Sequence, residues 1–122
     1  MPIYLHLVDY TAEGLAGLRK DGGTGRVAAL HTLAESVGGR LLHIWWSAGE
    51  PDCVTVFELP DDVASMALET RARASGSVSD SYRAIRLMGP EEVDRLRLIA
   101  PEYHEPGTSD RKSTRLNSSH RT

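Results

Sequence analysis

Four segments of the chain are predicted to be strands, and in the first of them Ile3, Leu5 and Leu7 fall on one face while Tyr4, His6 and Val8 fall on the other. The segments are 3–8, 40–47, 53–59 and 78–88. The link between the second and third segments, Ala-Gly-Glu-Pro-Asp at 48–52, is made of turn-forming residues. These two strands are therefore expected to form a hairpin.

Between the first two strands the apolar spacing changes to that of a helix. Thr11 is a suitable N-cap for a helix through Lys20, and Asp-Gly-Gly-Thr-Gly at 21–25 interrupts it. A second helical segment follows and ends at Gly38-Gly39. Its buried stripe is expected to be Val27, Leu30, Ala34 and Val37.

Two further helices are predicted in the second half of the chain. Pro60-Asp61-Asp62 places acidic groups at the start of a helix through about Ala74. Its expected core residues are Val63, Met66, Ala67 and Ala74. Gly89-Pro90 opens a short last helix with Val93, Leu96 and Ile99 on one side.

The element order β, α, β, β, α, β with a terminal helix predicts an α+β fold of the ferredoxin-like kind. A four-stranded antiparallel sheet carries its helices on one face, which leaves the other face uncovered. An exposed apolar sheet face requires a partner, and a homodimer formed through this face uses the same patch twice. The positions of β-bulges decide whether the aromatic, histidine and valine side chains of these strands lie on the covered or the uncovered face of the sheet. These side chains are Tyr4, His6, Val8, Trp45, Phe57 and Tyr82.

Composition and charge limit the classes of partner that the chain is expected to bind. The chain has 122 residues, enough for one domain, and no apolar run that could span a membrane. Residues 1–106 hold ten Lys and Arg against sixteen Asp and Glu, which is unsuited to binding nucleic acid. The single cysteine, Cys53, fits a reducing cytoplasm.

The C-terminal segment differs from the rest. Residues 101–122 are expected to be a disordered tail outside a domain at 1–100, because the last stretch is basic, small and polar. From about Asp110 to His120 it resembles translated sequencing-adapter DNA found at the ends of unrelated predicted proteins. Its positive charge is therefore not interpreted as a nucleic-acid or membrane signal.

Two histidines are the candidates for chemistry. His6 and His43 lie in strands that could be neighbours, and Asp9, Glu50 or Asp52 could accompany them as a metal site or an acid/base pair. A hydrogen-bonded structural histidine is the simpler interpretation. The chain lacks metal-motif spacing such as His-x-x-x-His, so neither a metal nor a cofactor is expected.

Aromatic and polar strand residues form a second set of candidates. Trp45 and Trp46 are adjacent in a strand, so one indole is expected in the core and the other on the opposite face. Glu58 is expected either in water or opposite Arg83 or Arg86, and Cys53 as a small core thiol. The candidate ligand-binding residues are Tyr4, Trp45, Glu58 and Tyr82.

Several short motifs in a fixed order give the chain a family resemblance from Met1 to about Leu98. It resembles the GYD-domain proteins, small proteins of bacteria and archaea. The motifs are Pro2-Ile3-Tyr4, Tyr10-Thr11-Ala12-Glu13-Gly14, Leu33-Ala34-Glu35 with Gly38-Gly39-Arg40, Gly49-Glu50-Pro51-Asp52, Leu59-Pro60-Asp61-Asp62 and Pro90-Glu91-Glu92.

The resemblance implies a ferredoxin-like fold related to the dimeric α+β barrels, with an unassigned activity. One position departs from the pattern, because Pro51 stands where the Gly-x-Tyr-Asp signature has its tyrosine. Any ligand role of that tyrosine is therefore absent here. Gly49 and Asp52 are explained by turn formation.

Two functional hypotheses remain. The first is a homodimeric module that binds a small ligand or a protein partner through its sheet face or its cleft. The alternative is a cofactor-independent enzyme of the oxygenase or isomerase type, for which His6, His43, Trp45 and Tyr82 would have to line one cavity. A shared pocket containing both histidines would favour the enzyme.

Overall fold

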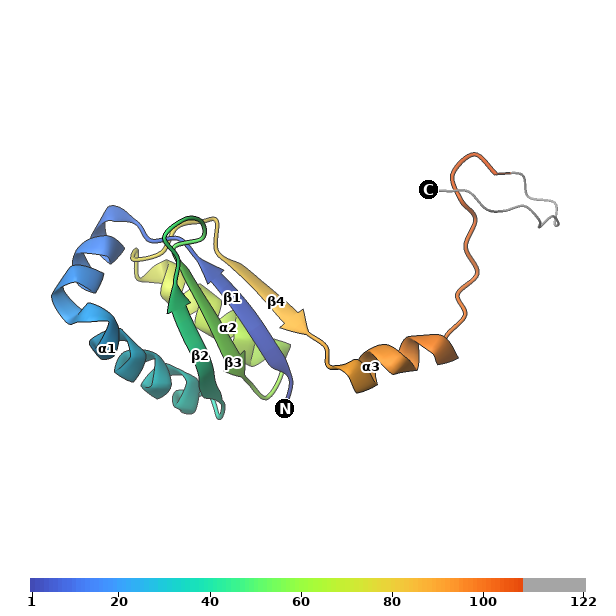
Figure 1. Cartoon of the computed structure of the whole chain (residues 1–122), viewed down its shortest axis with the longest axis horizontal. Helices are drawn as coiled ribbons and strands as arrows, with labels where there is room; N and C mark the ends of the chain where they lie inside the picture. Colours follow the sequence, from blue (N-terminus) through green and yellow to red (C-terminus); the bar gives the residue numbers. More distant parts are fainter. Residues whose placement is uncertain (109–122) are drawn as a thin grey trace. The chain divides into compact units, whose positions relative to one another are not determined.

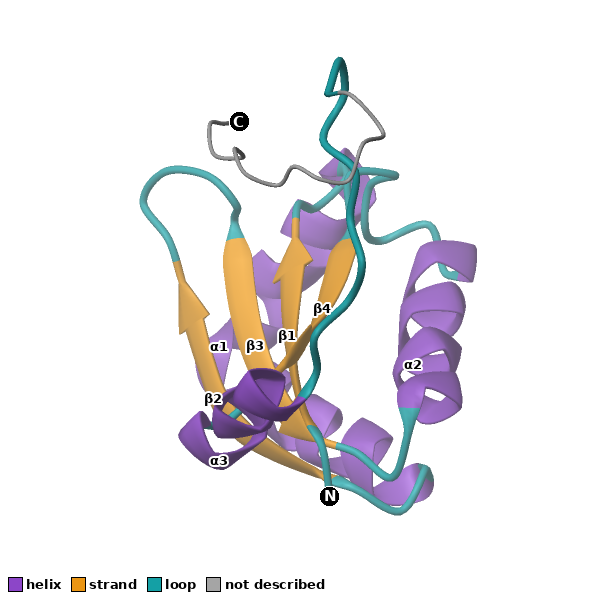
Figure 2. Ribbon diagram, turned by 90° about the vertical axis from the view of Figure 1, so that its right-hand side faces the viewer, coloured by secondary structure: helices purple, strands orange, loops and turns teal. Residues whose placement is uncertain are grey.

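The computed structural model describes residues 1–108 and contains one four-stranded antiparallel sheet. Its strands are β1 (Ile3–Val8), β2 (Arg40–Trp46), β3 (Cys53–Glu58) and β4 (Arg83–Leu87). They lie side by side in the order β2-β3-β1-β4 (Figure 2). The helices are α1 (Ala12–Ser36), α2 (Asp62–Ala74) and α3 (Pro90–Asp94), followed by the 3-10 helix η1 (Arg95–Leu98).

This arrangement confirms the α+β, ferredoxin-like βαββαβ fold, and Figure 1 follows the chain through it. The chain divides into two compact units, Met1–Gly89 and Pro90–Thr122. The first holds the sheet with α1 and α2, and the second begins with α3. Of the predicted tail, residues 101–108 are described, and residues 109–122, which include the adapter-like stretch from about 110, lie outside the described residues.

The sheet has one face covered by α1 and α2. Opposite residues in the register share a face, so Tyr4 with Phe57 and His6 with Thr55 lie on this inner face. The buried core joins the two helices to it through Tyr4, Ala34, Leu41, Phe57, Leu59 and Leu68. The stripe predicted for α1 is confirmed, with Ala34 buried and Val27, Leu30 and Val37 packed around it.

Helix α1 bends where the sequence predicts an interruption. Gly22 has a φ of 71° and a ψ of 170°, a left-handed conformation that breaks the helical backbone between two helical halves. Thr11 caps the first half, because its hydroxyl accepts a hydrogen bond from the Gly14 backbone N–H at 3.1 Å. The break lets two shorter helical halves, rather than one straight rod, follow the inner face.

A bulge in β2 decides which side each tryptophan takes. The pairing with β3 shifts between Leu41 and His43, so Leu42 is an extra residue in the strand. Beyond the bulge Trp46 is placed on the inner face and Trp45 on the opposite face, where Trp45 is 59% exposed. One indole on each side was the sequence expectation, and it is confirmed.

Helix α2 is rotated away from its predicted orientation. Val63 and Met66 are exposed, and Ser65 and Leu68 are buried instead. The Tyr4 hydroxyl donates to the Asp62 carboxylate at 2.5 Å, and Ser65 bonds to His6 at 2.9 Å. The side chains of Tyr4 and His6 are buried polar groups that need hydrogen-bond partners. The bonds from α2 that satisfy them therefore set the rotation of the helix, although this leaves Val63 and Met66 in water.

The fourth strand is shorter than predicted and begins at Arg83 instead of Val78. Val78 pairs only as an isolated bridge with Tyr10. The residues between them form a turn, in which the Ser81 backbone N–H donates to the Ser79 hydroxyl and Tyr82 N–H donates to the Ser79 carbonyl. Serine-rich side-chain bonding of this kind competes with strand pairing.

Candidate functional site

A cavity of about 240 Å³ lies between the inner face of the sheet and the two helices that cover it. Its floor comes from β3, through Cys53, Thr55 and Phe57. Its walls come from α1, α2 and the segments after β1 and before β4. Prominent wall residues are Tyr10, Gly14, Leu30, Leu68, Ala72 and Tyr82.

Hydrogen bonds to Asp9 and Asp52 join the loops next to the cavity residues Tyr10, Cys53 and Tyr82. Asp52 accepts from the Tyr10 backbone N–H at 2.9 Å, and Asp9 accepts from the Asp52 backbone N–H at 3.0 Å. Asp9 also accepts from the Ser81 hydroxyl at 2.8 Å. These carboxylates tie the β2–β3 hairpin to the segments that carry Tyr10 and Tyr82, so their role here is structural.

The start of α1 contacts the segment after α2 more closely than any side chain would allow. The Thr11 backbone N–H donates to the Ser77 carbonyl at 3.1 Å, and its hydroxyl donates to the Gly76 carbonyl at 2.6 Å. A Cβ atom at Gly14 would overlap the Ser77 carbonyl oxygen. Gly14 therefore permits the contact that closes the cavity wall.

His6 is fully buried on the inner face of β1, beside the cavity floor, and connects the segment before β4 to α2. Its Nδ1 lies 2.5 Å from the Tyr82 hydroxyl, and its Nε2 lies 2.9 Å from the Ser65 hydroxyl. The Phe57 ring contacts it edge-on, with centroids 5.1 Å apart. Burial lowers the pKa of His6 to about 4, so the imidazole is neutral at physiological pH.

A neutral imidazole has one donor and one acceptor nitrogen, and its partners determine which is which. A phenol is a stronger proton donor than an imidazole N–H, and a bare imidazole nitrogen is a stronger acceptor than a phenol oxygen. These strengths assign the Tyr82 O–H as donor to Nδ1 and the Nε2–H as donor to Ser65. Burial raises the pKa of Tyr82 well above its usual value, with the charge of Glu69 as a smaller cause, so the phenol keeps its proton.

Tyr10 forms the corresponding link on the other wall. Its hydroxyl accepts from the Trp46 indole N–H at 3.0 Å. Burial raises the pKa of Tyr10 to about 12, and burial also raises the pKa of the Cys53 thiol. Cys53 is therefore a protonated core thiol, as the sequence indicated.

Charged side chains occupy the rim of the cavity. Glu13, Asp21, Arg26 and Arg71 line it, and Arg26 faces Asp21 at 3.7 Å. Two acidic and two basic groups balance in formal charge. The interior is otherwise apolar, with a few hydroxyl groups and one thiol, which is the composition of a site for a small organic molecule.

The structure places the predicted site residues in three different surroundings. Tyr82 alone among them lines the cavity. Tyr4 is buried against α2, and burial together with Asp62 raises its pKa to about 12. His6 lies behind Tyr82, not at the surface of the cavity.

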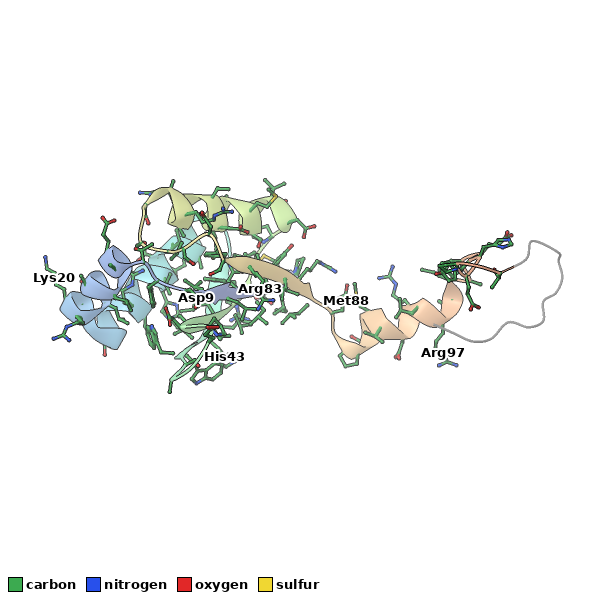
Figure 3. The ribbon with its side chains drawn as sticks, turned by 90° about the horizontal axis from the view of Figure 1, so that it is seen from above. Asp9, Lys20, His43, Arg83, Met88 and Arg97 are labelled. Carbon is green, nitrogen blue, oxygen red and sulfur yellow. The ribbon has the colours of Figure 1, made fainter. Side chains whose placement is uncertain are left out.

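His43, Trp45 and Glu58 lie on the face of the sheet away from the helices. His43 stacks on Trp45 with ring centroids 5.0 Å apart, and Figure 3 shows His43 on the side opposite α2. Glu58 pairs with Arg40 at 2.7 Å, not with Arg83 or Arg86 as expected, because β3 lies between β2 and β1.

The two candidate histidines are therefore not brought together. Strand β3 separates β1 from β2, and His6 and His43 lie on opposite sides of the sheet. Within residues 1–108 no group of three or more His, Cys, Asp or Glu side chains could hold a metal ion. No helix in the same residues is long and apolar enough to cross a membrane.

Sequence reasoning did not select Tyr10, Thr55 or Ser65 for the site. Thr55 alternates with Cys53 and Phe57, and this spacing could have placed it on their face of β3. Ser65, a polar residue inside a helix, was a weaker signal of a buried partner. Nothing in the sequence indicates that Tyr10 turns back toward Cys53 and Trp46.

Comparisons with known proteins identify a family and find similar solved structures. A family model described as the GYD domain matches residues 4–96. No curated protein matches the chain. Among solved structures, the chain is similar to an uncharacterized NIPSNAP domain protein from Burkholderia xenovorans, at 14% identity and a TM-score of 0.42, covering 73% of this chain and 94% of that chain.

Proposed function

The chain belongs to the GYD domain family, and we propose that it is a homodimeric module that binds a small, largely apolar ligand in the cavity between its helices and its sheet. The cavity itself is the observation that carries the proposal. A cavity of roughly 150 Å³ holds benzene, so one of about 240 Å³ accommodates a substituted single ring. A cytoplasmic location, inferred from the single cysteine, is part of the same proposal.

The enzyme alternative has less support. It required His6 and His43 to line one pocket, and they lie on opposite sides of the sheet. His6 is sealed beneath Tyr82 and Ser65. Binding without chemistry is therefore the function that the geometry favours.

A blocked cavity is expected to lose its ligand. Ala72 lines the cavity from α2, whereas Ala74 on the same helix is exposed and does not line it. With toluene as probe, amide shifts of cavity residues in ¹⁵N NMR spectra are expected for the wild type and for Ala74→Phe. Ala72→Phe fills the space and is expected to abolish them. Equal shifts in all three proteins would place the toluene elsewhere and contradict the proposal.

The open sheet face supports the homodimer. This face, defined by Ile3, Leu5, Leu7, Val54, Val56, Ile85, Leu87 and Trp45, is covered by no helix within Met1–Gly89. A patch of this composition in water favours association with an apolar partner. An occupant with the same apolar rows is a second copy of the chain.

Charges at two ends of the open face also fit a second copy. Arg83 lies where β4 begins and makes no ion pair within residues 1–108, and Glu58, which pairs with Arg40, lies at the far end of β3. A two-fold axis in the plane of the interface can exchange these ends. Arg83 of one copy then faces Glu58 of the other, with the apolar rows between them.

A charge at the centre of the open face is expected to separate the dimer. Leu5 lies between Val56 and Ile85, and Leu5→Glu would bury an unpaired carboxylate, costing several kcal/mol on association. Sedimentation equilibrium should give a dimer for the wild type and a monomer for Leu5→Glu. Val63→Glu, on the exposed side of α2, is the matched control and should stay dimeric. A monomeric wild type would contradict the dimer.

A further inference from the structure

Two hydroxyl groups of the cavity lining, those of Tyr82 and Thr55, already use their protons within the protein. Tyr82 donates to His6 Nδ1. Thr55 donates to the His6 carbonyl at 3.4 Å. A hydroxyl has one proton and two lone pairs, so these two groups present only lone pairs to a ligand.

The two guanidinium groups of the lining belong to Arg26 and Arg71, and Glu13 and Asp21 offset their charge. The Cys53 S–H is a weak donor. The Ser75 hydroxyl donates to the Ala72 carbonyl at 2.6 Å, which leaves the Ser77 hydroxyl to donate to Ser75. Tyr82 and Thr55 therefore offer a ligand acceptors and not donors.

Tyr82 is the stronger of these two acceptors. Its proton is drawn toward Nδ1 at 2.5 Å, and the imidazole passes the polarisation on to Ser65. A hydroxyl that donates in this way becomes a better acceptor, because hydrogen bonds in a chain reinforce one another.

We propose that the ligand is a small neutral alcohol or phenol, whose apolar body fills the cavity and whose O–H donates to the Tyr82 oxygen. The inference rests on the proposed ligand-binding function and specifies its chemistry. Removing the donor from the ligand leaves the Tyr82 lone pair unsatisfied, and removing the Tyr82 oxygen does the same to the ligand. Removing either the ligand O–H or the Tyr82 oxygen should weaken binding. Removing both should cost no more binding free energy than removing one.

Two probes test the inference on the full chain. p-Cresol carries a ring and an O–H, and 4-methylanisole carries the same ring with a methyl ether that cannot donate. Both are titrated by NMR into the wild type and into Tyr82→Phe, with circular dichroism to verify folding. Affinity for p-cresol is expected to fall roughly fivefold to tenfold in Tyr82→Phe, the ratio that one hydrogen bond contributes. Affinity for 4-methylanisole should stay unchanged.

Each other outcome has a distinct meaning. If Tyr82→Phe lowers the affinity for both probes by the same factor, the preference for a ligand O–H is refuted, although the cavity still binds ligands. If neither probe shifts cavity residues of the wild type, the proposed function fails and the inference fails with it. If Tyr82→Phe does not fold, the wild type alone decides, because 4-methylanisole binding at least as tightly as p-cresol would overturn the preference.

Discussion

Gly14→Ala is expected to destabilise the protein by about 1–3 kcal/mol, the usual range for an overpacked core site. The new methyl group would overlap the Ser77 carbonyl oxygen, which is backbone and already accepts from the Thr11 backbone N–H. Neither the Ser77 carbonyl nor the Thr11 backbone N–H can rotate away as the end of a flexible side chain would. The first turn of α1 must therefore separate from the segment after α2, and the cavity wall opens there.

Gly17→Ala is the matched control in the same helix. A Cβ at Gly17 meets nothing within 4 Å, so the substitution adds only helix propensity and should stabilise by about 0.5–1 kcal/mol. Urea unfolding gives the free energy of unfolding of both variants and of the wild type. The two substitutions are expected to change it in opposite directions. Equal effects from the two substitutions would show that the approach at Ser77 is looser than described.

The pattern of elements was predictable because it depends on local spacing. Alternation identified the strands, and Thr11 and Gly22 marked the start and the break of α1. The turn at 48–52 predicted the hairpin. These features depend on residues close in sequence, which is why the fold followed from the sequence.

The orientation of particular side chains was not predictable, because it depends on contacts between distant residues. The bulge at Leu42 decides the sides of Trp45 and Trp46, yet nothing local distinguishes it. Val63 and Met66 look like a buried stripe, but bonds from Tyr4 and His6 rotate α2 away from it. These hydrogen bonds join residues that are 58 and 59 positions apart in the sequence, so helical periodicity cannot predict them.

The site was predictable only in part for the same reason. Tyr82 and His6 were selected as candidates, but not as partners, since 76 residues separate them. The short fourth strand matters here, because it leaves Tyr82 in a turn beside the cavity instead of inside a ladder. The sequence supplied the residue types, and the tertiary pairing supplied the arrangement of acceptors.

The buried histidine is expected to make the protein lose stability between pH 6.5 and pH 4. His6 has a pKa of about 4 in the folded protein, because burial disfavours its charged form, against an ordinary value of 6.5. In this window the unfolded chain binds a proton that the folded protein does not, so the unfolded state is favoured as pH falls. The interval between the two values corresponds to about 3 kcal/mol, all of it present above pH 6.5 and lost by pH 4.

His6→Gln isolates this contribution, since glutamine keeps an amide for Tyr82 or Ser65 but does not titrate. Carboxylates elsewhere also lower stability in acid, and they do so in both proteins, so the difference between the two unfolding curves reports His6. That difference should change by about 3 kcal/mol across the window in urea denaturations at stepped pH. His31→Gln is the control: its side chain is exposed on α1, away from the open face, so this variant should follow the wild type. A difference curve that is flat for His6→Gln would mean that the imidazole is solvated or charged in the folded protein, and the assignment of the Tyr82 proton to Nδ1 would fall with it.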